Sequence, residues 1–109
     1  MYIMIAGPYS APTEEERRAN LERINCAAAK VAKMGHIPVV GVNLALPIIS
    51  SGEFADPYGE IMRISLAIAE RCDAILHLGL SPGVERELAV FHRKGLPIYK
   101  DLCELPPAK

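Results

Sequence analysis

The stretch AILHLGLSPGVERELAVFHRKGLPIY, residues 74–99, decides the fold. Within it, a short apolar run, a turn rich in glycine and proline, an amphipathic segment and a second apolar run follow one another, at Ala74–Leu78, Gly79–Gly83, Val84–Lys94 and Leu96–Tyr99. Short apolar runs bounded by turn residues are typical of buried strands, and an amphipathic segment of this length is typical of a helix. The stretch therefore predicts two parallel strands connected by a helix, because parallel neighbours need a crossover connection.

The same alternation of strand and helix occupies the rest of the chain. Strands are expected at Tyr2–Ala6 and Ile37–Val40, and helices are expected after the N-cap residues Thr13 and Asp56. Strands that are apolar throughout are typical of a parallel sheet with helices on both faces. Right-handed crossovers allow a doubly wound sheet, and we expect an α/β fold with a flavodoxin-like sheet of four parallel strands in the order 2-1-3-4. The remaining stretch, Gly41–Ala55, is expected to be a long irregular loop, of the kind that is often functional.

Length and composition narrow the class of protein. The 109 residues correspond to a single domain, residues 1–109, and 50 % of them are hydrophobic. Twelve basic residues face 13 acidic ones, so the formal charge of −1 argues against a dedicated nucleic-acid-binding protein. No apolar run reaches the roughly 18 residues of a membrane span. Three cysteines without CxxC spacing fit a reduced, cytoplasmic chain, and no spacing of His, Cys or Asp indicates a metal site.

The predicted strand order places the ligand site at the carboxyl ends of the first and third strands, where the winding of the sheet reverses. The loops at this position are Gly7-Pro8-Tyr9-Ser10 and Gly79–Gly83. In the second loop, Ser81 is the expected N-cap of a helix, and the free amides that follow it also suit a phosphate, so both interpretations stay open. Neither loop has a GxGxxG or Walker pattern, so neither a dinucleotide nor ATP is indicated. We expect no cofactor.

Glu87 is the candidate catalytic residue. On a helical projection, it falls in the apolar arc that contains Val84, Leu88 and Phe91. Glu85 falls on the opposite side. A buried carboxylate is destabilising by several kcal/mol unless it is paired, hydrogen-bonded or protonated, so its place beside the predicted crevice indicates a function. The structural alternative is a first-turn glutamate that bends towards solvent and interacts favourably with the helix dipole.

Three segments resemble the nucleoside 2-deoxyribosyltransferase-like superfamily. They are Ile5-Ala6-Gly7-Pro8-Tyr9-Ser10, Arg71-Cys72-Asp73-Ala74-Ile75 and Ser81-Pro82-Gly83-Val84-Glu85-Arg86-Glu87, the last of which is similar to the S-x-G-x-x-x-E segment of that superfamily. The similarity is especially to the 2'-deoxynucleoside 5'-phosphate N-hydrolases and to a small, mostly uncharacterised branch. In the order of its elements, the resemblance covers nearly the whole chain.

The resemblance implies a role for the matching residues. Glu87 stands at the position of the catalytic nucleophile, and Ser81 with the Gly83 amide stands at the position that holds a 5'-phosphate. Gly7 and Tyr9 are expected beside the sugar and the base, with Tyr9 as a second catalytic residue. Ser10, in the same loop, is expected to bind the substrate. Burial is expected to raise the pKa of Glu87, while the helix dipole and the Tyr9 hydroxyl are expected to hold the ionised carboxylate.

The second expected helix departs from the pattern of this superfamily. Characterised members carry an aspartate there that helps handle the sugar or the leaving base, whereas the corresponding stretch, Ile61–Ser65, contains no carboxylate. Asp56 and Glu60 at the start of the helix are candidates to replace it. Their alternative roles are an N-cap and a solvated acid in the first turn.

We therefore expect an enzyme that hydrolyses, or transfers across, the N-glycosidic bond of a nucleoside or nucleoside 5'-monophosphate. Glu87 would form a covalent glycosyl-enzyme through an oxocarbenium-like transition state. The alternatives are a non-catalytic nucleotide-binding module and a glutamate-dependent NAD glycohydrolase of the same broad architecture. The expected partner is thus a small molecule, with neither a nucleic acid nor a membrane involved.

A homodimer or a higher homo-oligomer is also expected, with the segment Gly41–Tyr58 at the interface. Apolar side chains in or beside this segment have little obvious core to receive them, namely Ile48, Ile49, Phe54 and Met62. Exposed apolar patches usually mark an interface, and a symmetric dimer is the simplest way to cover one.

The other polar side chains are expected to be structural. His77 is expected to be a hydrogen-bonded core residue, because it lies in a buried strand. His36 and His92 are expected at the surface, and Cys26 is expected on the packed face of the first helix.

Overall fold

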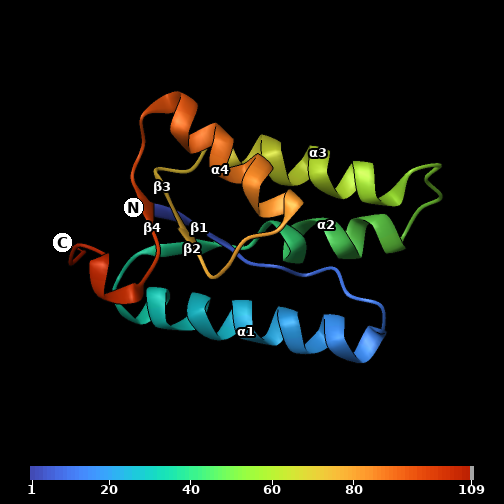
Figure 1. The fold of residues 1–109 in the computed structure, drawn as a ribbon, viewed down its shortest axis with the longest axis horizontal. Helices are drawn as coiled ribbons and strands as arrows, with labels where there is room; N and C mark the ends of the chain where they lie inside the picture. Colours follow the sequence, from blue (N-terminus) through green and yellow to red (C-terminus); the bar gives the residue numbers. More distant parts are fainter. Residues whose placement is uncertain (109) are drawn as a thin grey trace.

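Four short parallel strands form the sheet at the centre of the structure (Figure 1). The computed structural model describes residues 1–108, and its strands are β1 (Tyr2–Ala6), β2 (Ile37–Val39), β3 (Ala74–His77) and β4 (Ile98–Tyr99). Their order is β2-β1-β3-β4 and every pairing is parallel, with Ile5 opposite Leu76 in the central pair. The predicted fold class is therefore confirmed.

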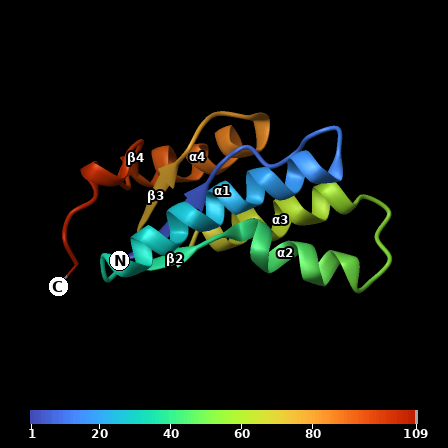
Figure 2. The ribbon, with the colours of Figure 1, turned by 90° about the horizontal axis from the view of Figure 1, so that it is seen from below.

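Helices follow the first three strands and cover the sheet on both faces. They are α1 (Glu14–Lys33), α2 (Gly41–Ser50), α3 (Pro57–Ala69) and α4 (Pro82–Lys94), and a short 3-10 helix at Leu102–Glu104 follows β4. Figures 1 and 2 show α1 against one face and both α3 and α4 against the other, while α2 lies beside α3. Among residues 1–108, no helix has the length and the hydropathy that crossing a bilayer requires.

Side chains predicted as N-caps hold the starts of three helices. Thr13, Asp56 and Ser81 each accept a hydrogen bond from the backbone amide three residues further on, at 3.1, 3.0 and 3.2 Å. α4 ends at Gly95, whose φ of 67° lies in the left-handed region that glycine adopts without a steric penalty. The caps fix where α3 and α4 begin, and both starts border the site described below.

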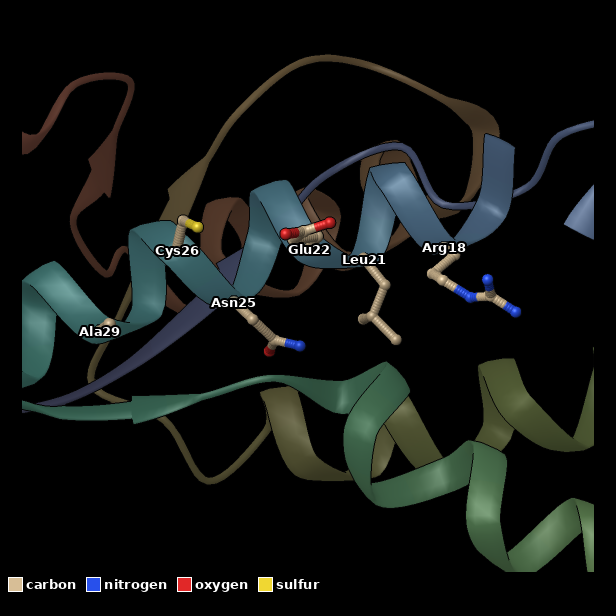
Figure 3. Close-up of a pocket in the computed structure, with 6 residues that line it drawn as sticks. All are labelled: Arg18, Leu21, Glu22, Asn25, Cys26 and Ala29. Atoms are coloured by element: carbon tan, nitrogen blue, oxygen red, sulfur yellow. The ribbon is translucent and has the colours of Figure 1, made fainter. Parts of the chain in front are cut away.

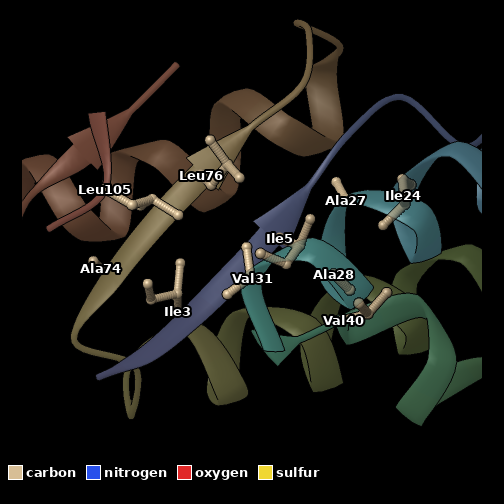
Figure 4. Close-up of a cluster of buried hydrophobic side chains, with 10 residues drawn as sticks. All are labelled: Ile3, Ile5, Ile24, Ala27, Ala28, Val31, Val40, Ala74, Leu76 and Leu105. Atoms are coloured by element: carbon tan, nitrogen blue, oxygen red, sulfur yellow. The ribbon is translucent and has the colours of Figure 1, made fainter. Parts of the chain in front are cut away.

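Two hydrophobic clusters fill the space on either side of the sheet. Successive residues of β1 point to opposite faces, so Ile3 and Ile5 join the first cluster and Met4 joins the second. Figure 4 shows the first cluster, between the sheet and α1. The second cluster lies between the sheet and both α3 and α4, and its largest member, Phe91, is fully buried. Burial of Phe91 anchors α4 on the sheet and fixes the rotation of its other side chains.

The prediction of a long loop at Gly41–Ala55 is wrong, because most of this stretch forms α2. Pro47 lies inside the helix, although proline in a helix interior is destabilising by about 3 kcal/mol. The helix buries Gly41, Ala45 and Ile49, which are spaced four residues apart and therefore share one face. Packing of this face, with α3 as its main neighbour, outweighs the local preference of Pro47 for a break.

α2 also changes the expected set of unpacked apolar side chains. Ile49 and Met62 are buried, contrary to expectation, because α2 and α3 pack against each other. Ile48 and Phe54 are exposed, at 54 % and 38 %, and Leu44 joins them at 46 %. The exposed apolar surface is therefore narrower than expected, with Leu44 and Ile48 on α2 and Phe54 in the connection to α3.

Three smaller predictions are wrong. His36 is buried, not at the surface, because the two ends of the chain pack around it, with its Nε2 2.7 Å from the Pro106 carbonyl oxygen and its Nδ1 3.1 Å from the Met1 amino nitrogen. The Nδ1 atom of His77 is buried but has no hydrogen-bond partner within residues 1–108. Cys26 is exposed, because it lies on the side of α1 that faces away from the sheet.

Candidate functional site

A cavity of about 500 Å³ lies where the chain leaves the carboxyl ends of β1 and β3. Its size is within the range of about 300–1,000 Å³ that is usual for small-molecule sites. Its walls come from the loop after β1 and from α2, α3 and the start of α4. All the site residues predicted from the sequence line it, namely Gly7, Tyr9, Ser10, Ser81, Gly83 and Glu87.

The start of α4 forms one wall of this cavity. Ser81 Oγ accepts a hydrogen bond from the Val84 amide. The proton of the Ser81 hydroxyl takes no part in this bond, so it is free to be donated to a ligand. A Cβ atom placed on Gly83 would lie 3.4 Å from Met62 Sδ and 3.6 Å from the Tyr58 hydroxyl oxygen. These are ordinary contact distances, so Gly83 leaves the wall open without being sterically required there. The capping role of Ser81 is present, and a role as a donor to a ligand is compatible with it.

Glu87 lies in the second turn of α4, not in the first turn, because the helix begins at Pro82, directly after its N-cap Ser81. The effect of the helix dipole falls off within the first turn, so the dipole does less for this carboxylate than expected. Glu87 is half-buried, and its Oε2 accepts a hydrogen bond from the Ser65 hydroxyl. Burial raises the pKa of Glu87 above its ordinary value, and the hydrogen bond from Ser65 opposes this rise.

Ser65 takes the place that was expected for Tyr9 beside the carboxylate. Within residues 1–108, the side-chain hydrogen bond to Glu87 comes from Ser65 in α3. Tyr9 lines the same cavity, and its backbone carbonyl accepts a hydrogen bond from Asn20 Nδ2 at 3.0 Å, which ties its loop to α1. Tyr9 is therefore placed to contact a ligand, while Ser65 is the neighbour that holds Glu87.

The sequence contains a signal for Ser65, although this residue belongs to none of the motifs. Ser65 falls in the same helical stripe as Ile61, Ile64 and Ile68, so it is a polar residue on an otherwise apolar face. Glu87 stands out in α4 for the same reason. Two polar residues on the inward faces of neighbouring helices need partners, and in this structure they are each other's partners.

Neither acidic residue considered as a second catalytic group lines the cavity. Asp56 is the N-cap of α3, and Glu60 forms an ion pair of 2.9 Å with Arg63. Glu87 is therefore the one carboxylate among the lining residues that the structure describes. Most of the wall on the side of α2 and α3 is apolar, and it is formed by Val42, Ile61 and Met62.

Tyr58 and Arg86 add a polar feature at one side of the cavity. Tyr58 lines the cavity from the first turn of α3, and the guanidinium carbon of Arg86 lies 6.0 Å from the centroid of its ring. This distance is at the outer limit of a cation–π contact. Arg86 itself is exposed, so its positive charge stands near the cavity without being buried in it.

A second depression, of about 410 Å³, lies on the outer side of α1 (Figure 3). Arg18, Leu21, Glu22, Asn25, Cys26 and Ala29 line it. It is lined by a single helix, and none of the predicted site residues takes part in it. Across residues 1–108, no group of three or more His, Cys, Asp or Glu side chains is arranged to hold a metal ion. The cavity beside Glu87 is therefore the better candidate for a functional site.

The raised pKa of Glu87 predicts a specific pH dependence of stability. Between the ordinary pKa and the raised one, the folded protein binds more protons than the unfolded chain, so stability falls as the pH rises through this window. Glu87→Gln removes this titration. The free energy of unfolding of the variant, relative to the wild type, should increase from about pH 4.5 upwards and level off above the raised pKa.

Urea denaturation at a series of pH values measures this difference. Glu85→Gln is the matched control, because Glu85 lies two residues away on the exposed side of α4. The free energy of unfolding of Glu85→Gln, relative to the wild type, should not increase over the pH range between the ordinary and the raised pKa of Glu87. If the difference in free energy of unfolding between Glu87→Gln and the wild type does not change with pH, the burial of the Glu87 carboxylate is contradicted.

Comparison of the chain with models of known protein families finds no match, and a search of curated proteins finds none either. The function is therefore inferred from the fold, from the geometry of the cavity and from the sequence motifs that line it.

Proposed function

We propose that this protein cleaves the N-glycosidic bond of a nucleoside or nucleoside 5'-monophosphate, with Glu87 as the nucleophile. The observation that carries the proposal is a half-buried carboxylate facing a cavity of ligand size at the point where the winding of the sheet reverses. The resemblance of Ile5–Ser10 and Ser81–Glu87 to the nucleoside 2-deoxyribosyltransferase-like superfamily supports the substrate class.

In the proposed reaction, a carboxylate oxygen of Glu87 forms a bond to the anomeric carbon while the carbon–nitrogen bond breaks. The electron pair of that bond leaves with the base, which takes up a proton from solvent water. Water, or a nitrogen atom of a second base, then attacks the anomeric carbon while the bond from that carbon to the Glu87 oxygen breaks. The attacking group loses a proton to solvent and the carboxylate is released, which gives hydrolysis or transfer. The sugar is oxocarbenium-like in both transition states, and a carboxylate stabilises this positive charge.

Ser81 favours a phosphorylated substrate within this proposal. A carboxylate at this position would repel a phosphate, whereas the Ser81 hydroxyl retains a proton to donate after capping α4. The exposed guanidinium of Arg86 adds a positive charge over the ring of Tyr58, which lines the cavity. We therefore propose a nucleoside 5'-monophosphate as the preferred substrate.

A non-catalytic nucleotide-binding module is the second candidate function. The observation in its favour is that Glu87 is the one carboxylate among the lining residues that the structure describes, so no acid stands beside the leaving base. Both candidates predict that a nucleotide binds, and they differ only in whether free base appears. Release of the base from a panel of nucleosides and nucleotides distinguishes them.

Replacement of Glu87 by glutamine should abolish release of the base. The amide keeps the size of the side chain, and its oxygen still accepts a hydrogen bond from Ser65, but it does not attack the anomeric carbon. Chromatography of free base after incubation with nucleoside 5'-monophosphates measures the effect. Glu85→Gln should retain wild-type activity, and equal activity of the Glu87→Gln variant and the wild type would contradict the mechanism.

A nucleoside 5'-monophosphate should bind at least about tenfold more tightly than the nucleoside with the same base. A charge-assisted hydrogen bond contributes roughly 1.5–3 kcal/mol, and 1.4 kcal/mol corresponds to a factor of ten. Titration calorimetry on the Glu87→Gln variant measures both affinities without turnover. Equal affinities would remove the proposed phosphate contact and favour a nucleoside as the substrate.

We also propose that a second copy of this chain covers the outer side of α2. Leu44 and Ile48 are neighbours on that side, both are about half exposed, and residues 41–52 include no charged side chain.

Light scattering should then give the mass of at least two chains, and Ile48→Glu should lower it to that of one. Ala89→Glu, on the exposed side of α4, should leave the assembly intact, and a monomeric wild type at micromolar concentration would contradict this interface.

A further inference from the structure

Ser65 is buried in the middle of α3, and its polar group is directed at another helix. Its side chain is 2 % exposed, and its hydroxyl donates a hydrogen bond to Glu87 Oε2, 22 residues further along the chain. Serine is a poor residue for a helix interior, and a buried hydroxyl needs a partner. The partner in this case is the carboxylate that faces the cavity.

The first residue of α2 leaves room for this hydroxyl. A Cβ atom built on Gly41 would lie 2.2 Å from Ser65 Oγ and 3.0 Å from Ser65 Cβ. Gly41 does not have a positive φ, so it is the space and not the backbone conformation that requires glycine. Any side chain at position 41 would displace the Ser65 hydroxyl. Three helices thus meet at one contact, with α2 leaving the space, α3 supplying the donor and α4 supplying the acceptor.

Ser65 supplies the hydrogen bond that favours the ionised form of Glu87. The other titratable side chains that line the cavity are Tyr9 and Tyr58, and neither carries a positive charge. Arg86, the cation next to Glu87 in the sequence, lies over the Tyr58 ring. Within residues 1–108, no ion pair involves Glu87.

We propose that Ser65 is a positioning residue for Glu87 and that Gly41 is required to keep it in place. The bond from Ser65 fixes Oε2, so that Oε1 is the oxygen that attacks the anomeric carbon. The same bond keeps the carboxylate ionised in a partly buried position, where the neutral form would otherwise be favoured. The catalytic part of this inference rests on the proposed function, whereas the effect on the ionisation of Glu87 does not.

The pKa of Glu87 in the Ser65→Ala variant tests this inference without turnover. Carboxyl carbon NMR across a pH titration measures that pKa, and Glu87→Gln identifies the signal. The pKa should be higher in Ser65→Ala than in the wild type by about one pH unit, because a hydrogen bond to a charged group is lost. Ser50→Ala removes an exposed hydroxyl at the end of α2 and should leave the pKa unchanged.

Gly41→Ala provides a second, independent change at the same contact. It leaves the Ser65 hydroxyl in the chain but displaces it, so the pKa of Glu87 should rise as in Ser65→Ala. Gly52→Ala is the matched glycine control, because the Cβ atom would meet only the exposed ring of Phe54. An unchanged pKa of Glu87 in folded Ser65→Ala protein would overturn the inference whether or not Gly41→Ala folds.

Catalysis distinguishes this inference from the proposed function. If the wild type releases base, the acidic limb of its pH–rate profile should move to higher pH in Ser65→Ala, with kcat lowered more than KM is changed. Base release with an unmoved acidic limb would overturn the positioning role and leave the proposed function standing. A raised pKa in Ser65→Ala, together with no base release by the wild type from any nucleotide, would support the positioning role and overturn the proposed function.

Discussion

The burial of one carboxylate is the constraint on which the site depends. Glu87 is on the side of α4 that packs inwards, where a charge is unfavourable unless the surroundings compensate for it. Compensation comes from the hydroxyl of Ser65, and room for that hydroxyl comes from Gly41. The carboxylate is thus held in a half-buried position, with a raised pKa and a cavity in front of it. These properties suit a group that reacts with a bound molecule.

The doubly wound sheet explains why this carboxylate borders a cavity at all. The chain leaves β1 and β3 on the same edge of the sheet, and their connections run to opposite faces. The loop that carries Tyr9 and the start of α4 therefore diverge, which leaves space between them. α3 closes this space from the side with Ile61 and Met62, so the cavity has a polar edge and an apolar wall. A sugar phosphate and a base differ in polarity in the same way.

Features that depend on local sequence were predictable, and features that depend on contacts between distant elements were not. The caps at Thr13, Asp56 and Ser81 depend only on the capping residue and the backbone amide three residues further on, and the strand order is one that right-handed crossovers allow. The sequence does not predict α2, because Pro47 on its own favours a break in the helix. Burial of Ala45 and Ile49 stabilises the helix only when α3 packs against it. The inward position of Glu87 was visible in the helical pattern, but its bond to Ser65 joins residues of two helices whose packing no motif describes.

The claim that Glu87 attacks the anomeric carbon is tested most directly by trapping the covalent intermediate. A 2-fluoro-substituted nucleoside 5'-monophosphate is suitable, because the fluorine destabilises the positively charged transition states and slows cleavage of the sugar ester. Mass spectrometry of the intact protein, followed by peptide mapping, locates any attached sugar. We predict the addition of one fluorosugar phosphate per chain, attached to Glu87. An unchanged mass, or a sugar attached to a different residue, would contradict the account.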